Sequence, residues 1–188
     1  MIHLIISVFW LIFLVYWAVS ALRAKRSVEG TAWWKQAALR FSILVFVVVG
    51  WLIPDVHRTL GRAPTHGSDD VLTGVIGTAI VAAGLGLAIY ARIYLGQNWG
   101  MPMSRKQDPD LVTGGPYAFI RHPIYSGIIL AMLGSAIGLS PVWVPPLIGF
   151  GAYFIYSARR EEEFLSQQFG ETYRAYRRRT KMLIPFVL

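Results

Sequence analysis

The chain has 188 residues, of which 55% are hydrophobic, and a formal net charge of +8. This length corresponds to about one domain, and so apolar a composition excludes an ordinary soluble one. Because the chain has no cysteine, a disulfide framework, a thiol nucleophile and a thiolate metal site are also excluded. The basic residues flank long apolar runs, which indicates orientation in a lipid bilayer and argues against a nucleic-acid-binding face.

Three apolar runs in the first half of the chain predict membrane-spanning helices over residues 2–22, 37–53 and 71–91. The first is long enough, at about 1.5 Å per residue, to cross roughly 30 Å of hydrocarbon. It has no basic segment before it and is too long for the apolar core of a signal peptide, so we interpret it as a retained helix. The third contains small residues that let helix backbones approach closely in lipid; these are Gly74, Gly77, Gly84 and Gly86.

Two shorter apolar runs, 124–139 and 142–158, are separated by Ser140 and Pro141. Two antiparallel helices joined by so short a turn form a helical hairpin. A charged helix and tail follow over residues 159–188. The predicted fold is therefore an all-α, polytopic integral membrane protein with five transmembrane helices, including this hairpin, and a helical tail.

The distribution of basic residues predicts the orientation of the five spans. Arg58 and Arg62 lie in the loop 54–70, whereas every other Lys and Arg lies in segments on the opposite face. The more basic face is normally cytoplasmic, so we expect the N-terminus outside and the C-terminus in the cytoplasm. We accordingly divide the chain into a scaffold, residues 1–94, and a catalytic half, residues 95–188, with a cofactor loop, the hairpin and the tail.

The tripeptide Arg121-His122-Pro123 lies at the start of the fourth predicted helix. Proline suits the first helical position, where its missing N–H has no cost, so His122 is at the helix mouth and Tyr125 lies further inward. A helix N-terminus attracts anions, and Arg121 adds a bidentate donor. This arrangement suits a carboxylate or phosphate at the membrane surface. The alternative is that Arg121 reaches lipid phosphates and His122 merely caps the helix.

Glu162 lies on the apolar side of the next predicted helix. Helical spacing groups it with Phe154, Ala158, Leu165 and Phe169, whereas Glu163 falls on another face with Tyr156, Arg160 and Gln167. A carboxylate facing packed apolar groups near a membrane is expensive and usually has a partner or a function. Glu162 is therefore either part of the chemistry, or it pairs with Arg121 or Arg159 and simply closes the fold.

Other polar groups are weaker candidates. The basic cluster 177–179 is typical of a patch that binds anionic lipid, although one of its members can reach a substrate anion. Asn98 and Trp99 follow the third span and supply an amide and an aromatic face. We expect no metal site, because three of the histidines are assigned to the other membrane face, namely His3, His57 and His66.

Three stretches together resemble the isoprenylcysteine carboxyl methyltransferase family and the related phospholipid methyltransferases. They are LGQNW (95–99), LVTGGPYAFIRHPIYSG (111–127) and EEEFLSQQFGETYRAYRRR (161–179), followed by LIP (183–185). The resemblance implies a membrane-embedded helical enzyme that binds S-adenosylmethionine from the cytoplasmic side and methylates a lipophilic acceptor in the bilayer.

The resemblance also assigns roles to single residues. The cofactor-binding residues would be Asn98, Tyr117, Arg121, His122, Pro123 and Tyr125. Glu162 and Arg179 would lie at the acceptor end, and Arg121 would join them as a catalytic residue. The family often has a histidine where this chain has Pro109, so a cofactor contact through that histidine is not carried over. The small residues Gly127, Ala131, Ser135 and Gly138 would leave room for a lipid tail between helices.

The type of acceptor decides which residue matters most. A carboxylate acceptor needs no base but needs an arginine to aim it, which favours Arg179, whereas an amine needs a base, which favours Glu162. Carboxyl O-methylation of an isoprenylcysteine or a similar lipid is the leading prediction. The alternatives are methylation of a phospholipid amine, a sterol-reductase-like enzyme and a membrane scaffold without catalysis. All the methyltransferase hypotheses require the tail to fold back so that Glu162 meets Arg121.

Overall fold

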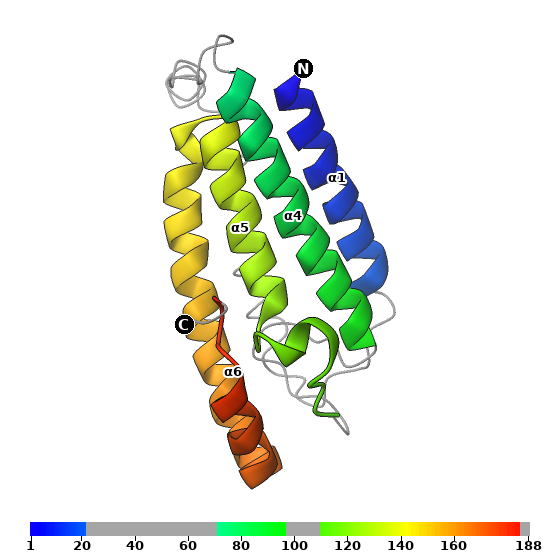
Figure 1. The fold of residues 1–188 in the computed structure, drawn as a ribbon, viewed down its shortest axis with the longest axis vertical. Helices are drawn as coiled ribbons and strands as arrows, with labels where there is room; N and C mark the ends of the chain where they lie inside the picture. Colours follow the sequence, from blue (N-terminus) through cyan, green and yellow to red (C-terminus); the bar gives the residue numbers. More distant parts are fainter. Residues whose placement is uncertain (22–70, 97–109, 185–188) are drawn as a thin grey trace.

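The computed structural model describes residues 1–21, 71–96 and 110–184, and all regular elements in these ranges are helical. The predicted second span and the loop 54–70 lie outside them. The long helices stand side by side (Figure 1). Their bounds are α1 Ile2–Ala21, α4 Val71–Leu95, α5 Pro123–Gly138 and α6 Val144–Arg179, with 3-10 turns η2 Gly115–Ala118 and η3 Pro141–Trp143.

The predicted helices of the described ranges are confirmed, and α4 is longer than expected. It continues past residue 91 to Leu95, through the buried side chain of Arg92. That guanidinium donates hydrogen bonds to the carbonyl oxygens of Gly96 at 2.8 Å and Ser20 at 2.7 Å. A buried charge is tolerated when it is hydrogen-bonded in this way, so the helix need not end before the arginine. The second bond also ties the end of α4 to the end of α1.

Helices α4 and α5 pack with their backbones in direct contact. A Cβ atom added at Gly84 would lie 2.6 Å from the backbone nitrogen of Ala131, and one at Gly134 would lie 2.7 Å from that of Val81. Only glycine fits at such distances, which confirms the predicted close approach. The expected room for a lipid tail beside Gly127 and Ala131 is wrong, because the backbone of α4 fills that space.

Helices α1 and α4 are the candidate membrane spans of the described ranges. Both are long and apolar enough to cross a bilayer, with mean hydropathies of 2.3 and 2.1. Only 11% of the α1 window is buried in the protein, so most of its apolar side chains face outward, as expected for lipid contact. Since residues 37–53 lie outside the described ranges and α5 has 16 residues, the total of five spans stays a prediction.

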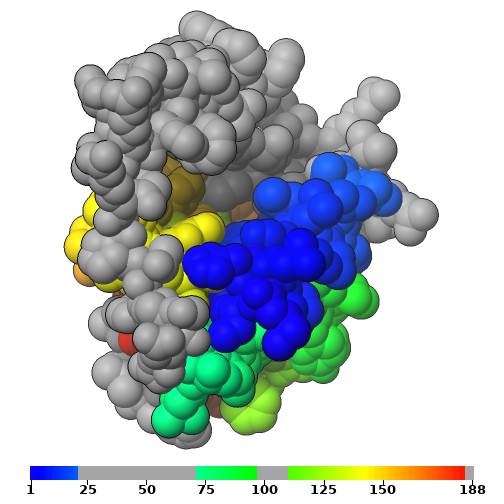
Figure 2. Space-filling model, turned by 90° about the horizontal axis from the view of Figure 1, so that it is seen from above, coloured from blue at the N-terminus to red at the C-terminus, as the bar shows by residue number. Residues whose placement is uncertain are grey.

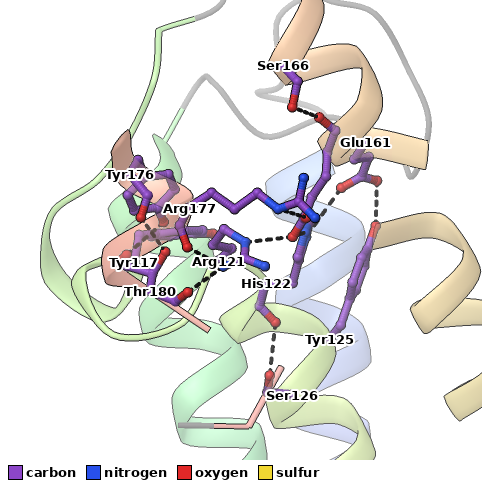
Figure 3. A network of polar contacts seen from close by, with 11 residues as sticks. Tyr117, Arg121, His122, Tyr125, Ser126, Glu161, Ser166, Tyr176, Arg177 and Thr180 are labelled. Carbon is purple, nitrogen blue, oxygen red and sulfur yellow. Dashed lines mark hydrogen bonds and ion pairs between the residues drawn. The ribbon is translucent and has the colours of Figure 1, made fainter. Parts of the chain in front are cut away.

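The end of the bundle near the N-terminus is seen from above in Figure 2, where α1 (blue) is in front, with parts of α4 (cyan to green) and the start of α6 (yellow) visible around it. A groove of about 330 Å³ opens here. It is lined by Ile6, Ser7, Trp10, Leu11, Leu14, Leu139 and Trp143. The polar residues singled out in the sequence lie at the other end of the helices, where α5 begins (Figures 1 and 3).

The hairpin of α5 and α6 has the predicted turn, in which the Ser140 side chain accepts a hydrogen bond from the backbone nitrogen of Val142. The second arm is much longer than expected, because α6 continues through the charged segment to Arg179. Gly170, with φ of 52°, interrupts it, a conformation that favours glycine. Beyond Gly170 the chain (red in Figure 1) returns alongside the preceding part of α6. The reversal at Gly170 was not predicted; the predicted fold-back concerns Glu162, which lies before it in α6 and contacts Arg121.

Candidate active site

The loop before α5 is held by the segment that follows α6. The backbone nitrogens of Arg121 and His122 donate to the carbonyl oxygens of Lys181 at 2.8 Å and Met182 at 3.1 Å. The hydroxyl of Ser126, in the first turn of α5, donates to the Leu183 carbonyl at 2.6 Å. We call residues 180–183 the strap. The strap fixes the backbone from which both side chains of the Arg-His pair project.

Arg121 meets Glu162 through a buried ion pair. Its Nε lies 2.6 Å from Glu162 Oε1, and the two side chains are only 9% and 6% exposed. Its Nη1 donates to the carbonyl oxygen of Thr180 in the strap. On the other side of the carboxylate, Nε of Arg177 lies 3.3 Å from Glu162 Oε2. Figure 3 shows Arg121 and Arg177 converging here. The hypothesis that Arg121 only reaches lipid phosphates is therefore wrong.

His122 lies between two carboxylates. Its Nδ1 is 3.6 Å from Glu161 Oε2, and its Nε2 is 3.5 Å from Glu162 Oε1. His122 occupies the N-cap position of α5, but its side chain makes no capping hydrogen bond. The imidazole is stacked on the ring of Tyr125 with a centroid distance of 5.5 Å. It is therefore placed toward the acidic residues of α6, and the hypothesis of a mere side-chain cap is wrong.

Tyr125 links this group to the body of the hairpin. Its hydroxyl donates to Glu161 Oε1 at 2.6 Å (Figure 3). The other face of its ring stacks on Phe154, with centroids 4.7 Å apart. A column of His122, Tyr125 and Phe154 thus connects the helix mouth with the apolar core. The side chains of α5 and α6 are locked against each other on both sides of the two glutamates.

The electrostatics of the site keep Glu162 ionised. Burial by itself would raise the pKa of this carboxyl, but hydrogen bonding and positive charge from His122 and Arg121 hold its pKa below the ordinary range. Burial has the opposite result for the neighbouring phenols. It raises the pKa of Tyr117, and it raises that of Tyr176 to about 12. Both phenols therefore stay protonated at neutral pH and act as hydrogen-bond donors.

The structure brings together most of the residues that the sequence singled out. Arg121, His122, Tyr125 and Glu162 form one cluster, and Pro123 begins α5 at a position that suits it. Asn98 and Pro109 lie outside the described residues. Glu162 is buried while Glu163 is exposed, as the helical spacing predicted.

Two of the predicted residues lie at the margin of this cluster. The Tyr117 side chain points to α4, where its hydroxyl donates to the Ala91 carbonyl at 3.4 Å, while its own carbonyl accepts from Tyr176. Arg179 is exposed and makes no side-chain hydrogen bond or ion pair within the described ranges.

Sequence reasoning gave too little weight to Arg177 and Glu161. In the sequence, Arg177 is one member of a basic cluster, and Glu161 is the residue before Glu162. The first could have been found only by knowing that the chain reverses at Gly170. The second had a signal in the sequence, because Glu161 directly precedes Glu162. A contact between Glu162 and Arg121 therefore also brings Glu161 near His122 and Tyr125.

The donor set fits a zwitterionic cofactor better than a metal. No group of three His, Asp or Glu side chains that could hold a metal occurs among residues 1–21, 71–96 and 110–184. In the same ranges, the buried Nε2 atom of His122 makes no hydrogen bond of ordinary geometry, although Glu162 Oε1 lies 3.5 Å away. A buried polar atom of this kind needs a partner. Carboxylates, guanidinium groups and phenols lie together here, and they can bind both the cationic and the anionic parts of one small molecule.

The fold is that of an integral membrane protein of known type. It matches the structure of the eukaryotic intramembrane Ras methyltransferase, isoprenylcysteine carboxyl methyltransferase, with a TM-score of 0.58 at 24% identity, over 85% of this chain and 55% of that one. The family model described as "Phospholipid methyltransferase" matches residues 72–172, which include α4, α5 and the acidic pair of α6. The chain belongs to the phospholipid methyltransferase family.

Curated relatives carry several names within this family. Protein-S-isoprenylcysteine O-methyltransferase of Schizosaccharomyces pombe is 32% identical over 101 residues, which cover 52% of this chain and 43% of that protein. Protein-S-isoprenylcysteine O-methyltransferase B of Arabidopsis thaliana is 31% identical over 115 residues, or 58% and 52%. Methanethiol S-methyltransferase 1 of Bradyrhizobium diazoefficiens is 38% identical over 74 residues, or 37% and 24%. The chain spans about half the length of the first two.

Proposed function

We propose that this protein is an S-adenosylmethionine-dependent methyltransferase that acts at a membrane surface on a lipophilic acceptor, by carboxyl O-methylation of an isoprenylcysteine or a similar lipid. The observation that carries the proposal is the buried pair of Arg121 and Glu162 at the mouth of α5. This pair joins the two sequence motifs that the family resemblance rests on, and the strap holds it in place. The names of the relatives in yeast and Arabidopsis support the same chemistry.

The cofactor would be held by the mouth of α5 and the residues around it. Arg121 and the helix N-terminus suit its carboxylate, and the column of His122 and Tyr125 offers an aromatic face. By resemblance, Tyr117 and Asn98 complete this set. S-adenosylmethionine, when bound, supplies a methyl group activated by a sulfonium. The protein has to hold acceptor, methyl and sulfur in line, and such alignment supplies most of the acceleration.

The state of Glu162 favours a carboxylate acceptor over an amine. An amine must lose its proton before it is methylated, and a base for this step works best with a pKa near the operating pH. Glu162 instead has a lowered pKa and contacts Arg121 and Arg177. It is therefore a poor base. A carboxylate acceptor needs only a cation that aims it, and Arg177 or, by resemblance, Arg179 would supply that cation.

We infer that the site faces the cytoplasm. The basic residues of the strap and of the end of α6 lie at this end of the helices, which is the side that positive charge normally marks as cytoplasmic. The N-terminus of α1 lies at the other end (Figure 1). A cysteine added at Ser7 should then react with an impermeant thiol reagent, if at all, only from outside. Labelling of a cysteine at exposed Arg178 from outside would contradict this orientation.

Binding of S-adenosylhomocysteine tests the cofactor. We expect isothermal titration calorimetry on the detergent-purified protein to show saturable binding at one site. The Glu162→Gln variant, which keeps the size of the side chain, should lose that binding, while Glu163→Gln, its exposed neighbour, should keep it. Absence of binding to the unmodified protein would remove the proposal.

Transfer of a labelled methyl group tests the acceptor. The protein should methylate a farnesylcysteine analogue and release the label as methanol on mild base treatment, as carboxyl esters do. Phosphatidylethanolamine and methanethiol should accept little. Faster transfer to phosphatidylethanolamine would favour methylation of a phospholipid, in keeping with the name of the family. Faster transfer to methanethiol would favour the thiol chemistry of the Bradyrhizobium relative.

A further inference from the structure

Tyr173 carries a buried hydroxyl without a partner. Its side chain lies on the returning part of α6 and is only 1% exposed. Its Oη has no hydrogen-bond partner among the described residues. Burying a phenol in this way destabilises a fold, and phenylalanine would fill the same volume without an unsatisfied donor. The hydroxyl therefore points to a ligand that the protein meets during function.

Tyr176 provides a built-in comparison. It is also buried and packs against Tyr173 with ring centroids 5.9 Å apart. Its hydroxyl, however, donates to the carbonyl oxygen of Tyr117 at 2.7 Å. Of these two neighbouring tyrosines, the hydroxyl of Tyr176 makes a hydrogen bond within the described structure and that of Tyr173 does not.

Helical spacing and the charges that act on the phenol associate Tyr173 with the charged cluster. Tyr173 lies one helical turn before Arg177, whose Nε is 3.3 Å from Glu162 Oε2. Burial raises the pKa of Tyr173, and the nearby charges of Glu162 and Arg121 act on it in opposite directions. The phenol thus stays protonated and keeps a proton that it can donate to an acceptor atom.

We propose that the Tyr173 hydroxyl donates a hydrogen bond to a carboxylate of a ligand bound between Arg121 and Arg177. A protonated phenol beside two arginines matches a carboxylate, because the guanidinium groups can only donate hydrogen bonds and repel a cation, and the phenol has a proton to add as a further donor. The inference rests on the proposed function, which offers two sources for such a group. One is the amino-acid carboxylate of the cofactor, and the other is the carboxylate of the methyl acceptor.

The test compares Tyr173→Phe with Tyr176→Phe and the unmodified protein. Thermal unfolding in detergent should leave Tyr173→Phe at or above the melting temperature of the unmodified protein, since no internal hydrogen bond is lost. Tyr176→Phe should melt at a lower temperature, because it leaves the Tyr117 carbonyl without its donor. A lower melting temperature for Tyr173→Phe would show an internal partner for the hydroxyl and would overturn the inference.

Calorimetry and kinetics then identify the carboxylate. If it belongs to the cofactor, Tyr173→Phe should bind S-adenosylhomocysteine about tenfold more weakly and bind 5′-methylthioadenosine, which lacks the carboxylate, as the unmodified protein does. If it belongs to the acceptor, both affinities should stay the same and the KM for farnesylcysteine analogue should rise about tenfold with little change in kcat.

Two results would overturn this inference and leave the proposed function standing. One is that Tyr173→Phe matches the unmodified protein in both affinities and in KM. The other is that it loses the same factor for both nucleosides, because the hydroxyl would then serve the nucleoside part or the general shape of the site. Failure of the unmodified protein itself to bind S-adenosylhomocysteine would instead remove the proposed function on which the inference rests.

Discussion

Two regions of this protein hold the helix hairpin in place by opposite means. Along α4 and α5, glycine backbones touch, and no side chain or charge takes part in the closest contacts. At the mouth of α5, the same helix is bound to α6 and the strap by charged side chains and backbone hydrogen bonds. The first region requires that the glycines have no side chain, and the second requires particular charged side chains.

This difference teaches where sequence change is tolerated. In the glycine-packed region, van der Waals contact and close approach hold the helices, so a larger residue is excluded whatever its chemistry. In the polar region, Glu162 is nearly isosteric with glutamine, which would fit the space but leave the charge of Arg121 unpaired. The size of a substituted side chain decides whether it is tolerated in the glycine-packed region, and its charge decides this in the polar region.

The largest effect is expected from breaking the polar region at Glu162. The change Glu162→Gln leaves Arg121 buried opposite a neutral amide, and removing one partner of a buried ion pair destabilises a protein by about 3–5 kcal/mol. We also expect methyl transfer to be abolished, and Arg121→Ala to have the same consequence. Denaturant unfolding in detergent and labelled-methyl transfer measure the two effects.

The matched control for this prediction is Glu163→Gln. Glu163 is exposed, and among the described residues its ion pair is with exposed Arg160 in the adjacent turn, so the change should alter stability and turnover little. Full activity of Glu162→Gln would remove that residue from the site, even if the variant were less stable.

A smaller effect is expected from filling the glycine-packed region. The change Gly84→Ala places a methyl group 2.6 Å from backbone atoms of α5, and such overpacking typically costs about 1–3 kcal/mol. Gly86→Ala on the same helix meets no atom within 4 Å and should be neutral or slightly stabilising. Thermal unfolding of the pair measures the difference. Equal melting temperatures would mean that α4 and α5 are not in backbone contact.

The two arginines near the acceptor end should differ. Arg177 contacts Glu162 through its Nε, whereas Arg179 is exposed. We expect Arg177→Ala to lower kcat/KM for the farnesylcysteine analogue about tenfold, equivalent to the loss of one charge-assisted hydrogen bond. Arg179→Ala should change it less than twofold. The reverse order would restore Arg179 as the residue that aims the acceptor, as the family resemblance implies.

The smallest effect concerns acid. The folded pKa of Glu162 lies below its ordinary value of 4.5. A lowered pKa contributes stability that is present above the unfolded pKa and is lost as the pH falls through the folded value. Unfolding free energy should therefore decline below about pH 4.5 in the unmodified protein, and the decline should be shallower in Glu162→Gln. Identical pH profiles would mean that another carboxyl group causes the decline.

The sequence predicted the helices of the described ranges and the buried acid of the site. Helical spacing alone placed Glu162 inward and Glu163 outward, and Pro123 marked the start of α5. These features are local, because the repeat of 3.6 residues per helical turn and the preference of proline for the first helical position can both be recognised within a few residues. The close contact of α4 and α5 was also predictable, because glycines in an apolar helix have few other uses.

The remaining features depend on contacts between distant segments. Arg92 lies inside α4 because its guanidinium donates hydrogen bonds to carbonyl oxygens at the ends of two different helices. The position of Arg177 beside Glu162 depends on a single φ angle at Gly170. The unpartnered hydroxyl of Tyr173 can be recognised only after every nearby acceptor has been placed. Periodicity and motifs in the sequence predict none of these three features.

The strap has a consequence for the order of biosynthesis. The carbonyl of Thr180 that accepts from Arg121 is 59 positions later in the chain. While the ribosome translates this interval, at roughly 5–20 residues per second, the guanidinium has no strap to bind. The contacts between the start of α5 and the strap can therefore form only after translation has passed residue 183, seconds after Arg121 itself has been made.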